Sequence, residues 1–412
     1  MKPRDKFPWA KHVKKIAIFS GVAALALVVL GTTWVYGSNG SGDKIAGQYI
    51  VVFQDNVPDV DGASDELAKA HGLGKSHVYK YALKGFAATI PAGRLKALKA
   101  DPRVAFVSED RPVSIFAQTL PTGINRIDAE QTTTHTNKGT GVNVAIIDTG
   151  IDLKHPDLQA NIAGGKNCST GKSYQDGNGH GTHVAGTVAA LNNGLGVVGV
   201  APEAKLWAVR VLNNAGSGTW SSVICGIDFV TSKAPVNGGP ITVANMSLGG
   251  SGTSDNNCGN TNSDALHKAI CKSRDAGVAY VVAAGNGGDN ASKFVPAAYD
   301  DAVITVSALA DSDGKSGGTG SATSYGADDT FATFSNFGSV VDLGAPGVSI
   351  LSTWKGGGYN TISGTSMASP HMAGASALYL KNNPGATWTE VRDGLKILAE
   401  SLGFGHTDPS GS

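Results

Sequence analysis

Four stretches of the chain are almost continuously apolar, and they constrain the fold more than any other feature. They are VNVAIID, LWAVRVL, ITVANMSL and VAYVVAAGN, at 142–148, 206–212, 241–248 and 278–286. Strands that are apolar on both faces are expected in a parallel sheet covered by helices on both sides. Gly- and Ala-rich segments with helical spacing lie between them. The sequence therefore predicts an α/β domain with a parallel sheet over residues 117–412, with functional side chains at the carboxyl ends of its strands.

The first 36 residues predict an export signal. Six basic residues precede an uncharged run of 21 residues from Ile16 to Tyr36. Basic residues stay on the cytoplasmic side while such an apolar run enters the translocation path. The run is long enough to span a membrane as a helix, and no clear cleavage site follows it. A cleaved signal peptide and an uncleaved anchor therefore both stay open, and the Gly/Ser-rich residues 37–43 predict a linker.

Residues 44–116 predict a small, separate α+β unit. Strand-like and helical patterns alternate there at 48–53, 65–73, 86–90, 94–100 and 104–110. This is a β-α-β-β-α-β-like order. Taken alone, the unit would be interpreted as a small binding module.

Composition excludes two classes of protein. The 412 residues include 33 Lys and Arg and 33 Asp and Glu, so the formal net charge is zero. We therefore expect no nucleic acid as a partner. A hydrophobic content of 41% is ample for a packed core and excludes wholesale disorder.

Asp148 ends the first apolar run, in the tripeptide Asp-Thr-Gly. Aspartic proteases carry the same tripeptide, but their chemistry needs a second carboxylate that shares a proton. The chain has no second Asp-Thr-Gly or Asp-Ser-Gly. Asp148 is therefore a candidate catalytic carboxylate, and the alternative is that it caps the following turn.

Residues 179–186, GHGTHVAG, open a helical pattern that contains two histidines. Zinc proteases of the zincin type place histidines at i and i+4 with a Glu between them, and this segment has neither feature. We expect His183 to project at the start of the helix, where it can act as a general base.

Ser366 lies in GTSMASPH, residues 364–371, at the start of another predicted helix. Unpaired N–H groups and the helix dipole favour negative charge there, which suits an oxyanion beside a nucleophile. Asn286 is the last residue of the fourth apolar run, and its amide can donate a second hydrogen bond to that oxyanion. The alternatives are a helix N-cap for Ser366 and an ordinary turn for Asn286.

The order Asp148, His183, Ser366, together with the two motifs, resembles the subtilisin-like serine proteases, which are secreted zymogens. The resemblance covers nearly everything from Lys44 onward. It implies a parallel-sheet subtilisin-like catalytic domain at 117–412, preceded by a small α+β ferredoxin-like propeptide at 44–116. By the same resemblance, Ser366 is the nucleophile, His183 the general base and acid, and Asp148 orients the imidazole. Asn286 and the Ser366 N–H then bind the oxyanion.

The resemblance also implies maturation and substrates. The propeptide would be a temporary inhibitor of its own enzyme, released by self-cleavage between Phe116 and Ala117. Polypeptide substrates would pair with two backbone segments and enter an apolar pocket, which favours large apolar or aromatic residues before the cut. Phe294 falls near the floor of this pocket, so the depth of the pocket is not decided by the resemblance. The substrate-binding residues implied are Gly216, Ser217, Gly218, Ser247, Leu248, Gly249, Ala284 and Gly285.

Calcium is the cofactor that the resemblance implies. The loop LNNGLGV, 191–197, is similar to the calcium loop of subtilisins, and its oxygens suit a hard cation. The implied ligands are Gln118, Asp157, Leu191, Asn193, Leu195 and Val197. The alternative is a Gly-rich turn. A second acidic group, Asp311, Asp313, Asp328 and Asp329, fails the EF-hand pattern and predicts a solvated loop.

All four cysteines follow residue 116, and an even number in an exported chain predicts two disulfides. Three pairings are possible, and we favour Cys168–Cys225 with Cys258–Cys271. We expect a secreted monomer that meets a membrane only through its leader. The rival hypothesis is an anchored binding module or pseudo-enzyme whose propeptide never leaves.

Overall fold

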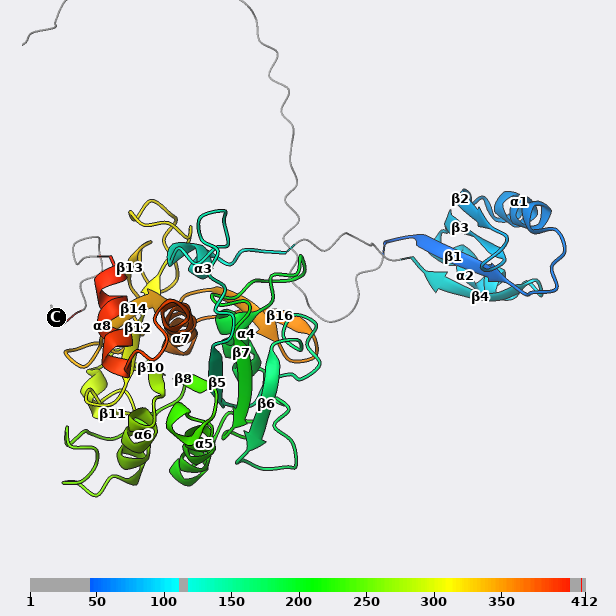
Figure 1. The fold of residues 1–412 in the computed structure, drawn as a ribbon. Coiled ribbons are helices and arrows are strands. Elements are labelled where there is room, and N and C mark those ends of the chain that lie inside the picture. Colours follow the sequence, from blue (N-terminus) through cyan, green and yellow to red (C-terminus); the bar gives the residue numbers. More distant parts are fainter. Residues whose placement is uncertain (1–44, 111–117, 401–408, 410–412) are drawn as a thin grey trace, which may run out of the picture. The chain divides into compact units, whose positions relative to one another are not determined.

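The computed structural model describes residues 45–110, 118–400 and 409, which belong to two compact units (Figure 1). The predicted leader (1–36), the linker (37–43) and the cleavage position Phe116–Ala117 lie outside the described residues. Within the described part of the chain, no helix is both long enough and apolar enough to cross a membrane.

The N-terminal unit is a four-stranded antiparallel sheet with two helices. Its strands lie in the order β2-β3-β1-β4, as in a ferredoxin-like fold. The elements are β1 (Gln48–Phe53), α1 (Val60–His71), β2 (Gly74–Tyr79), β3 (Gly85–Thr89), α2 (Leu95–Lys99) and β4 (Val104–Glu109). Val51, Phe53, Leu67, Phe86 and Leu98 form its core between sheet and helices. The predicted α+β unit is thus present, with β2 as the strand that the sequence pattern did not locate.

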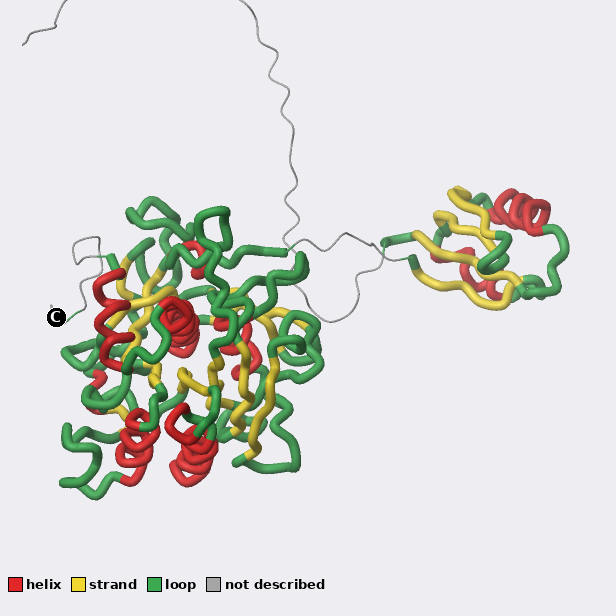
Figure 2. The backbone as a smooth tube through the Cα atoms, viewed as in Figure 1, coloured by secondary structure: helices red, strands yellow, loops and turns green. Residues whose placement is uncertain are grey.

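The larger unit is built on one long sheet, which Figure 2 shows as strands between helices. Its order is β13-β12-β10-β8-β5-β7-β6, with β14 also paired to β12. All pairs are parallel except β12 with the short β13. The strands are β5 (Asn143–Asp148), β6 (Ile162–Asn167), β7 (Lys205–Arg210), β8 (Ile241–Met246), β10 (Ala279–Ala283), β12 (Ile304–Ala310), β13 (Thr330–Phe331) and β14 (Leu343–Pro346). The predicted parallel sheet is confirmed.

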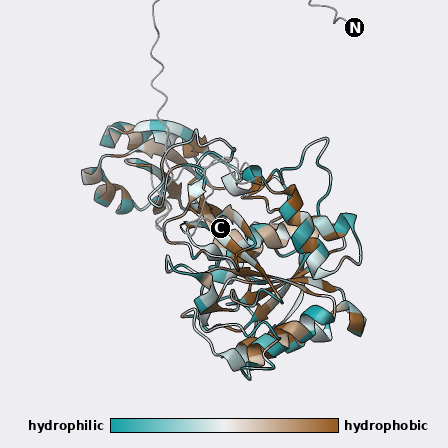
Figure 3. Ribbon diagram, turned by 90° about the vertical axis from the view of Figure 1, so that its left-hand side faces the viewer, coloured by the Kyte–Doolittle hydropathy of each residue, from teal (hydrophilic) through white to brown (hydrophobic). Residues whose placement is uncertain are grey.

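Helices cover both faces of this sheet. Helices α4 (His180–Ala189) and α7 (Thr365–Asn382) pack on one face, and α5 (Trp220–Ser232) and α6 (Ala265–Asp275) pack on the other (Figure 1). Along β5 the side chains alternate between the two layers. Val144 and Ile146 join the core under α4 and α7, while Ala145 and Ile147 join the core under α5 and α6. This is why the apolar runs are continuous, and Figure 3 colours these central strands brown.

Shorter elements complete the larger unit. Two small antiparallel pairs join β9 to β11 and β15 to β16. The remaining elements are α3 (Thr122–Arg126), β9 (Gly250–Ser251), β11 (Phe294–Val295), β15 (Ile350–Trp354), β16 (Gly358–Ile362) and α8 (Trp388–Leu398).

Candidate active site

Asp148 is the last residue of β5 and is completely buried. Its Oδ1 atom accepts a hydrogen bond from the Thr149 N–H at 2.7 Å. His180 begins α4, and its Nδ1 atom lies 2.8 Å from Oδ1 and 3.0 Å from Oδ2 of Asp148. Burial alone would lower the pKa of His180, but the charge and hydrogen bond of Asp148 outweigh it, so the pKa is raised above its ordinary value. Asp148 therefore holds the ring and favours its protonated form.

The sequence-based assignment of His183 as the partner of Asp148 is wrong. The ring of His183 is fully buried one turn further along α4, where its Nε2 atom lies 2.9 Å from the Ile350 carbonyl oxygen and 3.2 Å from that of Asn360. Burial lowers its pKa to about 4. Residues three apart on a helix lie on the same side of it, so the sequence pattern does not separate the two histidines. In the structure, His180 is the first residue of α4 and lies next to the carboxyl end of β5. His183 instead packs under the β15–β16 hairpin.

Ser366 is the second residue of α7 and is half-buried. Its hydroxyl donates to the Ser247 carbonyl oxygen at 3.3 Å, and the Ser247 hydroxyl donates to the Ser366 carbonyl oxygen at 2.8 Å. The hydroxyl of Ser366 is therefore not hydrogen-bonded to His180 in this conformation. Catalytic hydrogen bonds are often long or differently aligned without substrate.

Asn286 lies at the carboxyl end of β10 and faces the start of α7. Its Oδ1 atom accepts from the N–H and the hydroxyl of Thr365, at 2.8 and 2.9 Å. A Cβ atom at Gly364 would lie 3.4 Å from Nδ2 of Asn286 and 3.7 Å from the backbone N of Ser366. Two hydrogen-bond donors thus border one small space, which the missing side chain of Gly364 leaves open.

A cleft of about 740 Å³ connects several of these residues. His180 and Ser247 both line it. Because Ser366 is hydrogen-bonded to Ser247, Ser366 lies beside the same cleft as the imidazole of His180. Of the implied substrate-binding residues, Gly216, Ser217, Gly218, Ser247, Leu248 and Gly249 line this cleft. Ala284 and Gly285 are not part of its lining, because Ala284 is fully buried in the core and Gly285 donates to the Thr365 hydroxyl at 3.1 Å.

Sequence reasoning missed several residues of the cleft. Leu212, Thr219, Trp220 and Val223 also line it, next to the glycine segment 216–218. Trp220 opens α5 and is 37% exposed. The sequence position of Trp220 could have indicated its role, because Trp220 comes two residues after a segment already assigned to substrate binding. No acidic side chain is among the described residues that line this cleft.

The six implied calcium ligands converge on one loop. The Nε2 atom of Gln118 lies 2.6, 3.2 and 3.0 Å from the carbonyl oxygens of Leu191, Leu195 and Val197. Asp157 accepts the Val197 N–H on Oδ2 at 2.9 Å, whereas its buried Oδ1 has no hydrogen-bond partner among the described residues. Burial raises the pKa of Asp157. The oxygen and nitrogen of an amide side chain are assigned by their contacts, so Gln118 can equally offer its oxygen here. An orphaned carboxylate oxygen among carbonyls fits a hard cation.

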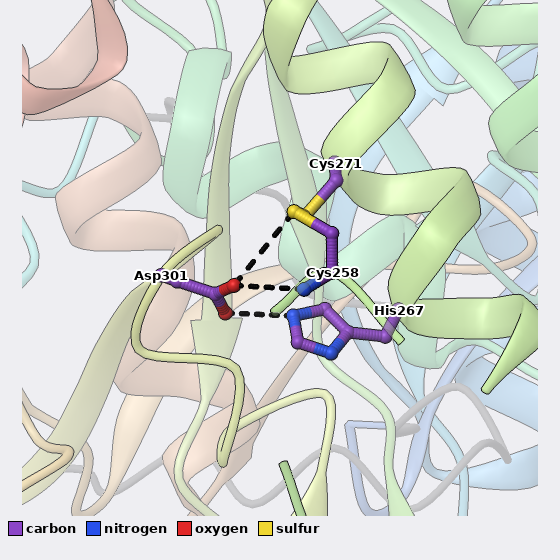
Figure 4. Close-up of side chains that lie close together, drawn as sticks. All are labelled: Cys258, His267, Cys271 and Asp301. Atoms are coloured by element: carbon purple, nitrogen blue, oxygen red, sulfur yellow. Dashed lines mark hydrogen bonds and ion pairs between the residues drawn. A yellow bond between two sulfur atoms is a disulfide. The ribbon is translucent and has the colours of Figure 1, made fainter. Parts of the chain in front are cut away.

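Both disulfides have the favoured pairing. Cys168 bonds Cys225, and Cys258 bonds Cys271. The second disulfide lies beside His267, which is fully buried and has its Nε2 atom 2.7 Å from Oδ1 of Asp301 (Figure 4). Thiolates are the sulfur ligands of metals, so this group of side chains is not a metal site while the sulfurs are bonded to each other.

The predicted solvated loop is present, since residues 315–319 are exposed and Asp313 is half-buried, but three carboxylates of the second acidic group are not solvated. Asp311, Asp328 and Asp329 are 3%, 5% and 1% exposed. They are buried because backbone N–H groups of the segment 312–320 and the side chain of Arg126 turn toward their carboxylates.

Comparison with known proteins agrees with this geometry. Residues 139–409 match the Subtilase family of peptidases. The chain belongs to this family. Residues 48–116 match the peptidase inhibitor I9 family. Subtilisin NAT of Bacillus subtilis subsp. natto is 41% identical over 364 residues, which cover 86% of each chain. The alkaline protease of Shouchella clausii is 42% identical over 308 residues, covering 74% of this chain and 72% of the relative.

A solved structure shares the fold. The crystal structure of a cold adapted subtilisin-like serine proteinase is 36% identical, has a TM-score of 0.57, and is matched over 71% of this chain and 95% of that chain. This subtilase is therefore a serine endopeptidase of the subtilisin type, with an I9 inhibitor domain at its N-terminal side.

Proposed function

We propose that Ser366, His180 and Asp148 form the catalytic triad of this endopeptidase. The observation that carries the proposal is the contact of His180 Nδ1 with Asp148, at 2.8 Å, in a cleft whose lining residue Ser247 holds Ser366. Nδ1 is engaged by the carboxylate, so Nε2 is the ring nitrogen left to accept a proton from the serine. The rotatable hydroxyl of Ser366 turns from Ser247 toward His180 when substrate binds.

The reaction then follows from these groups. Nε2 of His180 takes the Ser366 proton while Oγ attacks the carbonyl carbon of the scissile bond, and Asp148 stabilises the imidazolium that forms. The oxyanion occupies the space beside Gly364, where it accepts from the Ser366 N–H and the Asn286 amide. His180 then protonates the leaving amine, and water attacks the acyl-enzyme with His180 again as base.

Substrate selection is proposed from the cleft. The segments 216–218 and 247–249 both line the cleft, which suits an extended peptide bound by its main chain. Leu212, Leu248 and Val223 supply apolar lining, and acidic groups are missing from the described lining residues. We expect broad specificity with large apolar or aromatic residues before the cut, and weak cleavage after Lys or Arg.

Maturation is proposed as self-cleavage between Phe116 and Ala117, after export directed by residues 1–36. Support comes from the I9 match, which ends at residue 116. The I9 domain is then the enzyme's own temporary inhibitor. The precursor carrying Ser366→Ala should keep its I9 domain covalently attached, whereas the parent should yield a chain beginning at Ala117. A Ser366→Ala precursor that matures unaided would refute self-cleavage.

Calcium is proposed as a structural cofactor held by the Gln118 side chain, Asp157, Asn193 and the carbonyl groups of Leu191, Leu195 and Val197. Bound there, the ion would neutralise the buried carboxylate of Asp157 and tie residue 118 to the loop after α4. The protein supplies the ligand oxygens, and the carbonyl oxygens of Leu191 and Val197 already point toward the Gln118 side chain.

One assay separates this proposal from an inactive binding module. The mature chain should release a fluorophore from a peptide with Phe before the cut, a serine-directed inhibitor should abolish the release, and a zinc chelator should not. Processed chain that binds peptide but never cleaves it would overturn the enzymatic proposal. Running the assay with and without calcium tests the cofactor.

A further inference from the structure

We propose that the segment 311–329 binds a second Ca²⁺ ion, through the carboxylates of Asp311, Asp313 and Asp328. One carboxylate oxygen from each of these residues lies within 4.8 Å of those of the other two. The segment connects β12 to β13 in the larger unit, at a place distinct from the Asp157 loop.

Asp311 has a buried carboxylate oxygen that no described residue satisfies. The Asp311 side chain is completely buried, and its Oδ1 atom accepts from the N–H groups of Asp313 and Gly314 at 3.1 and 2.7 Å. Its buried Oδ2 atom has no hydrogen-bond partner among the described residues. Leaving such an atom unsatisfied is costly, and here it belongs to a residue that lies in a cluster with two further carboxylates.

Negative charge around Asp311 exceeds the positive charge that Arg126 supplies. Arg126 Nε lies 3.7 Å from Oδ2 of Asp311, beyond hydrogen-bond distance, because its N–H is donated to Asp329 at 2.9 Å. The same guanidinium donates to both oxygens of Glu400 at 2.9 and 2.8 Å. The single positive charge of Arg126 is thus shared by the carboxylates of Asp311, Asp329 and Glu400. Two further carboxylates, those of Asp313 and Asp328, lie close to Asp311.

The chemistry of the donors selects the ion. All three side chains offer oxygen, which suits Ca²⁺ and Mg²⁺ rather than zinc or copper. Two of the ligands come from one end of a 19-residue segment and one from the other, so their spacing can adapt. Ca²⁺ accepts six to eight oxygens in flexible geometry, with carboxylates binding through one or two oxygens, whereas Mg²⁺ demands a near-ideal octahedron. We therefore assign Ca²⁺, with water completing the shell.

The consequence of binding is a fixed loop. Asp328 already accepts the N–H groups of Ser312 and Gly320, at 2.8 and 2.6 Å, so it joins the two ends of the segment. An ion between Asp311, Asp313 and Asp328 adds a second connection at the same point. Lys315 is exposed between these ends and reports on the loop as a trypsin site.

The test measures bound calcium on the full chain carrying Ser366→Ala, so that the outcome does not depend on proteolytic activity. Equilibrium dialysis against CaCl₂ is done for this protein and for versions that also carry Asp313→Asn, Asp157→Asn, or both. Asp228→Asn, an exposed carboxylate on α5, is the matched control. We expect Asp313→Asn to remove one equivalent of Ca²⁺, or to weaken its binding at least about tenfold, and the control to change nothing. Asp157→Asn should remove a different equivalent, and the double variant both.

A second readout is cleavage by trypsin after Lys315, followed by mass spectrometry. Calcium should slow this cut at least about tenfold in the Ser366→Ala chain, and Asp313→Asn should be cut equally fast with calcium and with chelator. Circular dichroism confirms that the variant is folded. Calcium binding by Asp313→Asn that equals that of the Asp228→Asn control would overturn the inference. If Asp157→Asn lost one equivalent of Ca²⁺ and Asp313→Asn lost none, the inference would also be overturned. That result would still support the calcium site proposed at Asp157.

Discussion

The Nδ1 atom of His180 lies 2.8 Å from Oδ1 of Asp148, across the junction of β5 and α4. The carboxylate is fully buried, whereas the imidazole side chain is 26% exposed and lines the cleft. One end of the ring is therefore fixed inside the protein, and the other end is available to a substrate.

The two histidines of α4 should separate activity from stability. Replacing His180 by Ala should lower kcat/KM by about 10⁴-fold or more, with folding unaffected, because the base is lost. His183→Gln, which keeps a donor for the Ile350 carbonyl, should keep kcat/KM within about tenfold and lower the melting temperature. Both variants are assayed with a fluorogenic peptide after maturation by added parent enzyme. The reverse pattern would show that His183 is the base.

The activity of the enzyme should have an acid limb set by His180. The imidazole must be neutral to act as a base, and Asp148 raises its pKa above the ordinary value of 6.5. kcat/KM should therefore fall with decreasing pH through a midpoint above 6.5, with a slope of one proton. In Asp148→Asn the His180 pKa should drop, which NMR titration of the ring can follow. A His180 pKa that does not move in this variant would contradict the role given to Asp148.

Asn286 should act on the chemical step. Asn286→Ala removes one donor from the space beside Gly364, so kcat should fall by about 10²–10³-fold with little change in KM. Steady-state kinetics on the same peptide measure both constants. Asn178→Ala is a suitable comparison, because Asn178 also lines the cleft but its amide donates to the Asn214 carbonyl oxygen. A rise in KM with unchanged kcat would mean that Asn286 binds substrate rather than the oxyanion.

Stability should decline below neutral pH because of two buried histidines. Burial lowers the pKa of His183 and of His371 to about 4, whereas in the unfolded chain each titrates near 6.5. Between these values the unfolded chain binds protons that the folded chain does not, so stability falls as pH drops from about 6.5 to 4. At pH 4.5 the loss should be about 2 to 3 kcal/mol per histidine.

Urea unfolding of the Ser366→Ala chain at pH 7 and pH 4.5 measures this loss. His371→Gln in the same background should flatten the pH dependence, even if it lowers stability at pH 7. An unchanged slope in that variant would show that other groups are responsible.

The fold was largely readable from the sequence because apolar runs and helical spacing report burial directly. The strand β5 ends at Asp148 as expected, and the family motifs located the starts of α4 and α7. The strand β2 was missed because its GKSHVY sequence is polar and lies largely exposed at a sheet edge.

The choice between His180 and His183 was not readable from local pattern. The two residues lie three positions apart at the start of one helix, and only the position of Asp148 and of the β15–β16 hairpin distinguishes them. The same holds for Asp311, whose burial depends on Arg126, nearly two hundred residues away in the chain. Contacts over such separations follow from the completed fold.

Both covalent cross-links lie in the layer of α5 and α6. Cys168–Cys225 ties the end of β6 to α5, and Cys258–Cys271 ties the loop beyond β9 to α6. The layer of α4 and α7, which carries the histidine and the serine, has no such bond within the described residues. Reduction of the disulfides by a thiol-rich medium would thus destabilise the layer that supports peptide binding and leave the catalytic groups in place. Loss of function would then appear first as weaker substrate binding and only later as a slower chemical step.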